Sequence, residues 1–246
     1  DHPQFGTIRP EEFVAIAEES GVIVDIGRWM IEEAARQVAA WRERYERRFF
    51  AAVSVTSRQL RDPRMQSMVL VALDRHRLPL DGLQIEVTEA SLAEAPEAAQ
   101  AVLKSLRARG VRIGLENFGT GHSSLGQVRR LPLNSLKLDR SLVADLYSDP
   151  WAQGVTAAVL AMARAMQIRT VADGIDDPAT LEMLHALGCD ELQGLHVAPP
   201  MKPLDFEDWL ERGGARHLAR RRMGTGRDLP ELPDSAVEDI MKWGNG

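Results

Sequence analysis

The sequence has 246 residues, 44% of them hydrophobic, and a formal net charge of -6 at pH 7. This length and hydrophobic content suffice for one domain with a full core, the usual size of one α/β barrel. The negative charge argues against a general nucleic-acid surface, and the longest apolar run, Val155 to Ala163, is too short to cross a membrane.

The single cysteine, Cys189, excludes an intramolecular disulfide and a cysteine-based zinc site. No signal peptide is visible, so we expect a cytoplasmic protein. The sequence begins at Asp1-His2-Pro3 rather than at a methionine, and we expect a fragment of a longer polypeptide.

The first third of the chain predicts two helices, a strand, a third helix and a second strand. Residues 11–19 and 25–45 have helical spacing of apolar side chains, and residues 49–56 read as a strand. Asp62 is predicted to cap the next helix, with Pro63 at its first position and a buried stripe from Met65 to Leu73. Residues 83–89 are the second predicted strand.

Strands and helices then alternate to residue 212. The predicted strands are 111–116, 134–138, 168–172 and 189–193, and the predicted helices are 96–109, 123–130, 150–166, 178–187 and 204–212. Each of the six strands precedes a helix. This alternation predicts a parallel sheet, either open and doubly wound or closed into a barrel.

Polar residues at the strand ends favour the barrel. Six of them, from six different strands, lie at or near a carboxyl end: Ser54, Glu89, Glu116, Lys137, Asp173 and Gln193. An open sheet gathers its ligand residues mainly at one switch point, whereas a barrel collects them from every strand around one rim. We expect an α/β barrel with these side chains at one mouth.

A glycine-rich turn follows the third strand. Glu116 is predicted to close that strand, and Gly119, Thr120 and Gly121 then form a tight turn with exposed amides. The turn either binds a ligand or is an ordinary capped loop. It lacks the lysine and the spacing of a P-loop, which argues against a nucleoside triphosphatase.

The domain is predicted to span residues 1–213, with a tail at 214–246. The tail contains a basic patch at Arg216 and Arg220 to Arg222, a linker at 224–233 and a possible short helix capped by Asp234. It is either a partly ordered extension or a docking helix whose apolar face packs on this domain or on a partner.

Several motifs resemble EAL domains, the cyclic di-GMP phosphodiesterases of bacterial signalling. They are FGTGHSSL at 118–125, LKLDRS at 136–141, GCDELQG at 188–194 and VTE at 87–89, with IGRW at 26–29 and SRQL at 57–60 in addition. The resemblance spans about residues 2 to 210. It implies a TIM-type barrel whose Glu-Ala-Leu motif and first two strands lie upstream of the position that matches Asp1, and are missing from this chain.

The resemblance also implies roles for the strand-end residues. Such enzymes use two Mg²⁺ or Mn²⁺ ions, which prefer oxygen ligands. The metal positions are matched by Glu89, Glu116, Asn117 and Ser54; the catalytic positions by Lys137, Asp173 and Gln193; and the nucleotide-binding positions by Gly119, Thr120, Gly121 and Gln193.

Four matched positions depart from the family pattern. Ser54 replaces an asparagine, Glu116 and Asn117 replace two aspartates, and Asp173 replaces a glutamate. We expect weakened or lost metal binding. Two local alternatives remain: Lys137 as an ion-pair partner of Glu116, and Asp173 as the cap of the following turn.

Three functions therefore compete. The chain is a cyclic di-GMP receptor without hydrolysis, a protein-docking regulatory module that binds no nucleotide, or an active metal-dependent phosphodiesterase. The departures favour the first two. Family resemblance also implies other signalling domains in a longer polypeptide, with a homodimer as a further possibility.

Overall fold

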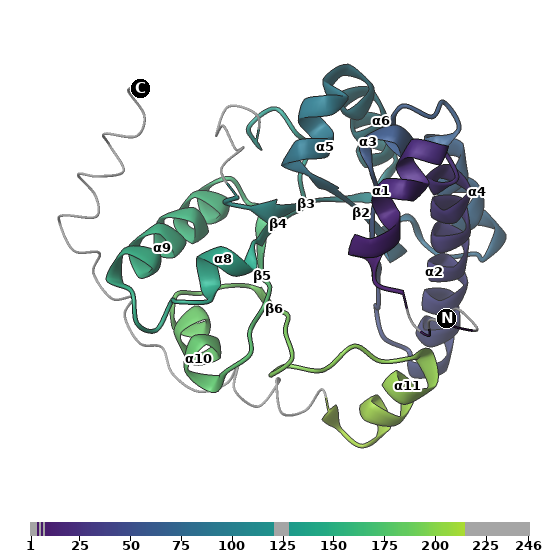
Figure 1. The fold of residues 1–246 in the computed structure, drawn as a ribbon. Helices are drawn as coiled ribbons and strands as arrows, with labels where there is room; N and C mark the ends of the chain where they lie inside the picture. The colour runs from purple at the N-terminus through teal and green to yellow at the C-terminus, as the bar shows by residue number, and fades with distance from the viewer. Residues whose placement is uncertain (1–3, 5, 7, 121–127, 215–246) are drawn as a thin grey trace. The chain divides into compact units, whose positions relative to one another are not determined.

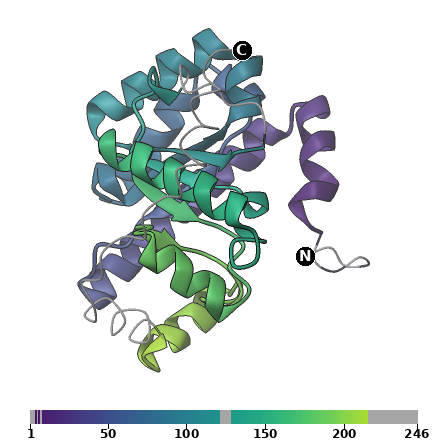
Figure 2. The ribbon, with the colours of Figure 1, turned by 90° about the vertical axis from the view of Figure 1, so that its left-hand side faces the viewer.

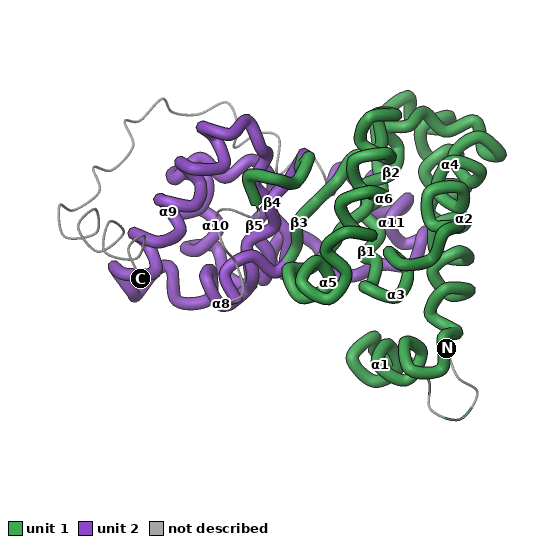
Figure 3. The backbone as a smooth tube through the Cα atoms, turned by 90° about the horizontal axis from the view of Figure 1, so that it is seen from above, with its two compact units in different colours: residues 1–116, 122–133 green, residues 117–121, 134–246 purple. Residues whose placement is uncertain are grey.

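The computed structural model describes residues 4, 6, 8–120 and 128–214. The chain divides into two compact units. Unit 1 comprises residues 1–116 and 122–133, and unit 2 comprises residues 117–121 and 134–246 (Figure 3).

Unit 1 contains three parallel strands and the helices that alternate with them (Figure 1). In chain order its elements are α1 (Pro10–Ser20), α2 (Ile23–Tyr45), β1 (Ala51–Ser54), α3 (Ser57–Leu60), α4 (Met65–Arg75), η1 (Leu80–Gly82), β2 (Leu83–Thr88), α5 (Glu89–Glu94), α6 (Pro96–Arg109) and the first part of β3 (Arg112–Phe118). The strand order is β1-β2-β3. Helix α1 stands apart from the strands (Figure 2), and Ala17 is its only buried residue.

The core of unit 1 follows from the period of two along its strands. Val53, Ile85 and Ile113 are neighbours in register, and all three are buried. Helix α6 begins with a proline in its first turn and ends at Arg109. The next residue, Gly110, has a φ of 106°, and its N–H bonds the Leu106 and Arg107 carbonyls. Local signals therefore place the helix that precedes β3.

Unit 2 repeats the alternation. Its elements after β3 are β4 (Ser135–Leu138), α8 (Arg140–Val143), α9 (Pro150–Ala165), β5 (Arg169–Ala172), α10 (Pro178–Ala186), β6 (Glu191–Leu192) and α11 (Pro203–Glu211), with β4, β5 and β6 parallel and in that order. Asp139, Asp149 and Asp177 each accept a hydrogen bond from a backbone N–H of the helix that follows. Helix α11 has no buried residue.

The structure confirms the predicted α/β class and all six predicted strands, and it corrects several boundaries. Asp62 does not cap α4: it accepts from the Arg64 N–H at 2.7 Å, and the helix begins at Met65. Strand β2 ends at Thr88, so Glu89 begins a helix. Strand β3 continues to Phe118, so Glu116 does not close it.

The short helices α3, α5 and α8 have four to six residues, too few for a helical period to be visible in the sequence. Most of the predicted helix at 123–130 and almost the whole predicted tail lie outside the described residues, so the domain boundary at 213 remains a prediction. Among the described helices, none is long and apolar enough to cross a membrane.

Candidate functional site

Strand register brings the unit 1 candidates onto one face of the sheet. Ser54 is the register neighbour of Glu86, and Thr88 is the register neighbour of Glu116. Register neighbours in a parallel sheet point to the same side, and so do residues two apart on a strand. Ser54, Glu86 and Glu116 therefore share a face, and the Ser54 hydroxyl donates a hydrogen bond of 3.1 Å to Glu116 Oε2.

Glu86 is a candidate that the sequence reasoning missed. It is 3% exposed, and its Oε1 accepts a hydrogen bond of 2.9 Å from the Gln84 side chain. The available signal was a carboxylate in the middle of a strand whose opposite face carries the apolar Leu83, Ile85 and Val87. Burying a carboxylate is costly, so its place on the face that carries Ser54 and Glu116 makes Glu86 a candidate for binding.

Glu89 lies on a helix, whereas Ser54, Glu86 and Glu116 lie on strands. It is the first residue of α5, behind Thr88, whose hydroxyl oxygen accepts from the Ser91 N–H at 3.0 Å. Glu89 is 4% exposed, and neither carboxylate oxygen has a hydrogen-bond partner among the described residues. Burial raises the pKa of Glu89 to about 7. Below about pH 7 this carboxyl group is mostly protonated and neutral. Above about pH 7 it is a buried carboxylate without a hydrogen-bond partner among the described residues.

The unit 2 candidates depend on turns rather than on register. Asn117 has a φ of 57° and Gly119 a φ of 104°, both in the left-handed region. Asparagine tolerates this region better than most residues, and glycine adopts it without strain. A Cβ at Gly119 would also lie 2.3 Å from Leu142 Cδ1, so the leucine side chain would have to shift. The Thr120 hydroxyl donates to the Asn117 carbonyl at 3.2 Å. Gly121 lies outside the described residues.

A second turn in unit 2 carries Asp173 next to the backbone of Gln193. Asp173 Oδ1 accepts from the Gly174 N–H at 2.7 Å, which is the turn-capping role that the sequence left open. The Gln193 N–H donates to the Ala172 carbonyl at 2.8 Å, and the Gln193 carbonyl accepts from Ile175 at 3.1 Å. The side chain of Gln193 is exposed. Lys137 is half-buried on β4, opposite Val171 of β5.

The structure thus brings together Ser54 and Glu116 in unit 1, and Asp173 and the Gln193 backbone in unit 2. The convergence of all the strand-end residues at one mouth remains a prediction, because those residues belong to both units. Within the described parts of the chain, no group of three or more His, Cys, Asp or Glu side chains is placed to hold a metal ion. The roles of all the matched residues likewise remain predictions.

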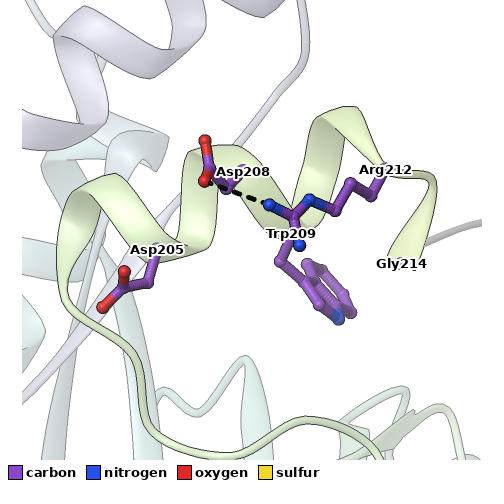
Figure 4. A pocket seen from close by; sticks show the side chains of 5 residues that line it. All are labelled: Asp205, Asp208, Trp209, Arg212 and Gly214. Carbon is purple, nitrogen blue, oxygen red and sulfur yellow. Dashed lines mark ion pairs between the residues drawn. The ribbon is translucent and has the colours of Figure 1, made fainter.

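A pocket in unit 2 contains none of these residues. It is lined by Asp205, Asp208, Trp209, Arg212 and Gly214, all on or next to α11 (Figure 4). The one ion pair drawn there, Arg212 to Asp208 at 3.6 Å, joins two side chains that are mostly exposed. An exposed pair of this kind contributes little binding energy, and the pocket is not a candidate site.

Comparisons with known proteins agree with the motifs. The model of the EAL domain family matches residues 1–200. The chain is 35% identical over 210 residues to the cyclic di-GMP phosphodiesterase PdeR of Escherichia coli, covering 85% of this chain and 32% of that protein. It is 37% identical over 201 residues to the bifunctional diguanylate cyclase/cyclic di-GMP phosphodiesterase MucR of Pseudomonas aeruginosa, covering 82% and 29%. The chain thus spans about a third of the length of these curated relatives.

Solved structures show the same likeness. The PaMucR phosphodiesterase in its c-di-GMP complex matches with a TM-score of 0.79 and 36% identity, covering 83% of each chain. The Xanthomonas citri FimX EAL domain in complex with c-diGMP matches with a TM-score of 0.74 and 28% identity, covering 80% of this chain and 77% of that one. These matches confirm the predicted fold class, an α/β barrel of the TIM type.

Proposed function

The chain belongs to the EAL domain family, and from this premise we propose that it binds cyclic di-GMP and hydrolyses it very slowly or not at all. It then acts as a receptor in cyclic di-GMP signalling, together with other domains of a longer protein. Its structural relatives include two whose c-di-GMP complexes have been solved.

The hydrogen bond between Ser54 and Glu116 is the observation that carries the proposal against hydrolysis. The family pattern places an asparagine oxygen and a shorter aspartate at these positions, both available to a metal ion. Here the serine hydroxyl and the Glu116 carboxylate bond to each other at 3.1 Å. The extra methylene of a glutamate also displaces its carboxylate by about 1 Å or more, which the strict octahedral geometry of Mg²⁺ tolerates poorly.

The donor types nevertheless suit a hard divalent cation. Glu86, Glu89 and Glu116 supply carboxylate oxygens, the ligand type that Mg²⁺ and Mn²⁺ prefer, but the described residues do not place three such groups together. A bound ion would supply polarisation of a phosphoryl oxygen and a more acidic water. Asn117 provides an amide in place of a carboxylate, which removes one negative charge from the set. Metal binding should therefore be weak.

Nucleotide binding relies on groups that the departures leave in place. Gly119 and Thr120 are exposed residues of a turn, and Gln193 is an exposed residue with a side-chain amide. Backbone N–H groups in such turns can hold a phosphate without a metal ion. We therefore expect binding of cyclic di-GMP that does not require Mg²⁺.

The alternative is an active phosphodiesterase, and one observation favours it. Glu89 is buried with no partner for either oxygen among the described residues, as expected of a carboxylate that binds a cation. PdeR and MucR, at 35% and 37% identity, carry phosphodiesterase names. A role in protein docking alone is the outcome if no nucleotide binds.

Isothermal titration with cyclic di-GMP, in EDTA and in Mg²⁺, tests the proposal. A receptor should give heat in both buffers, and Gln193→Ala should weaken binding, whereas Gln153→Ala on α9 should not. Chromatography of the same samples checks for the linear dinucleotide. Turnover at about 1 per second or faster would establish the phosphodiesterase. The absence of heat at near-millimolar nucleotide would leave only the docking role.

A further inference from the structure

Two arginines share one aspartate at the amino ends of the strands of unit 1. Arg42 lies in the last turn of α2, Arg48 lies in the segment that leads to β1, and Asp81 lies in η1, immediately before β2. A third arginine, Arg112, is the first residue of β3. We call these four residues the arginine cluster. They come from four segments and meet only in the folded unit.

Asp81 is the common acceptor of the cluster. Its Oδ1 lies 3.0 Å from Arg42 Nη1, and its Oδ2 lies 2.8 Å from Arg48 Nη2 and 3.8 Å from Arg112 Nη2. Burial by itself would raise the pKa of Asp81, but the hydrogen bonds and charges of Arg42 and Arg48 outweigh it and lower that pKa. The carboxylate therefore stays ionised at neutral pH. One negative charge is therefore shared by at least two guanidinium groups, and the cluster keeps an excess of positive charge.

Arg42 has a donor without an acceptor. Its side chain is only 14% exposed, Nε donates to the Phe49 carbonyl at 2.5 Å and Nη1 bonds Asp81. Its Nη2 is buried, and none of the described residues accepts from it. A buried guanidinium N–H without an acceptor is destabilising, so this atom marks a position where an acceptor would be stabilising.

Arg48 supplies the accessible side of the cluster. Its side chain is 85% exposed, and a guanidinium has five N–H donors, of which the bond to Asp81 uses one. The guanidinium carbon of Arg112 lies 4.4 Å from the centre of the Phe50 ring, within range of a cation–π interaction. The cluster thus combines one anchored arginine with one that can close over a ligand.

We propose that the arginine cluster binds a phosphate group, either inorganic phosphate or the phosphate of a small ester. Guanidinium groups hold phosphate through paired N–H···O bonds. A phosphate dianion offers acceptors to the exposed Arg48 and to the buried Arg42 Nη2, which the ligand reaches only after the groups that cover it move aside. A monocarboxylate has half the charge and compensates the excess positive charge less well. Phosphate is therefore the class of ligand that fits best.

This site is separate from the one that carries the proposed function. In the same three strands of unit 1, the arginine cluster lies at the amino ends, whereas Ser54 and Glu116 lie at or near the carboxyl ends. No residue is shared between the two sites. Failure of the phosphate proposal would leave the cyclic di-GMP proposal intact, and the reverse holds as well.

The test is a titration of the protein with inorganic phosphate, followed by NMR of the arginine Nε–Hε signals at constant ionic strength. We expect the signals of Arg42 and Arg48 to shift with a dissociation constant of about 1 mM, as two charge-assisted hydrogen bonds allow. Acetate should bind at least about tenfold more weakly. Equal binding of acetate and phosphate, or shifts absent from both arginines, would refute the site.

Three variants sharpen the titration. Arg48→Gln should weaken phosphate binding about tenfold or more, because a charge-assisted contact is lost. Arg47→Gln removes the same charge from the exposed neighbour outside the cluster and should change binding less than about twofold. Arg42→Lys keeps the charge but lacks Nη2, and it too should weaken binding. An equal effect of the Arg47 and Arg48 variants would show a general charge effect and overturn the proposal.

Discussion

The two units hold their candidate residues by different means. In unit 1, Ser54, Glu86 and Glu116 are on strands, and register neighbours place them on one face. In unit 2, Asn117, Gly119 and Asp173 are at or next to positions with positive φ, and hydrogen bonds within short turns orient them.

The two halves also differ in charge and burial. Unit 1 contributes three carboxylates, two of them less than 5% exposed, whereas unit 2 contributes the half-buried Asp173 carboxylate, an asparagine amide and backbone N–H groups of turns. Carboxylates suit cations, and turn amides suit phosphate oxygens. We therefore expect that metal binding can be lost while nucleotide binding is kept, because the two depend largely on different residues.

The largest expected effect comes from restoring the family pattern. The variant that combines Ser54→Asn, Glu116→Asp, Asn117→Asp and Asp173→Glu should hydrolyse cyclic di-GMP at least about 10³-fold faster than the unmodified protein with Mg²⁺ or Mn²⁺, since each misplaced group commonly costs 10²–10³-fold. Conversion to the linear dinucleotide measures it.

Two double variants, one in each unit, test how much each unit contributes to this gain in activity. The pair in unit 1, Ser54→Asn with Glu116→Asp, and the pair in unit 2, Asn117→Asp with Asp173→Glu, should each recover far less than the full gain. Groups that act together at one site are not additive. Full activity from either pair alone would show that one half suffices.

Adding a Cβ at a glycine should lower the free energy of unfolding more in unit 2 than in unit 1. Gly194 has a φ of 154°, and a Cβ there would lie 2.3 Å from the backbone N and O of Ile175. Gly194→Ala should lower the free energy of unfolding by about 4 kcal/mol, from backbone strain and overlap with atoms that cannot move aside. Urea denaturation measures this loss.

The matched control is Gly110→Ala in unit 1. That glycine also has a positive φ, 106°, but its Cβ would meet the Leu80 side chain only at 3.5 Å, an ordinary contact. Gly110→Ala should lower the free energy of unfolding only by the backbone strain, about 1–2 kcal/mol. Equal losses for the two variants would mean that the close approach in unit 2 is unimportant.

The buried carboxyl group of unit 1 predicts a pH dependence. The pKa of Glu89 is about 7 in the folded protein against an ordinary value of 4.5. The folded state therefore binds more protons between these values, and stability should fall as pH rises from about 4.5 to 7, by about 3 kcal/mol in EDTA. Glu89→Gln should lack this fall.

Chemical denaturation across that pH range measures the effect. Glu97→Gln, at an exposed position in the first turn of α6, is the control and should keep the fall. Stability that rises with pH through the interval in the unmodified protein, and becomes flat in Glu89→Gln, would contradict the assignment.

The smallest expected effect compares two strand residues, Ser54 on β1 and Asn117 on β3, of which only Asn117 has a positive φ. Asn117→Ala should cost about 1 kcal/mol, because alanine is disfavoured at a φ of 57°. Ser54→Ala should cost about 0.5 kcal/mol, because its hydrogen bond to Glu116 is exposed to solvent. Asn117→Gly should be no less stable than the unmodified protein, and a clear loss there would point to the asparagine side chain instead of the backbone.

Local sequence signals predicted the secondary structure and the family. Pro96 and Gly110 bound α6, Asp177 caps α10, and each of the six strands lies within or overlaps its predicted range. The motif-bearing segments around Glu116 and Gln193 are sufficient by themselves to indicate the EAL family. These features depend on residues a few positions apart, whose backbone preferences and periodicity can be read directly from the chain.

Only the tertiary structure decided which polar groups meet. Ser54 and Glu116 are 62 residues apart in sequence, and Arg48 and Asp81 are 33 apart, so their contacts depend on which strands pair and in which register. The same pairing places Glu86 on the face of Ser54, and packing leaves Glu89 buried without a partner among the described residues. A shift of one residue in register would send each strand side chain to the opposite face, and local sequence preferences alone do not determine register.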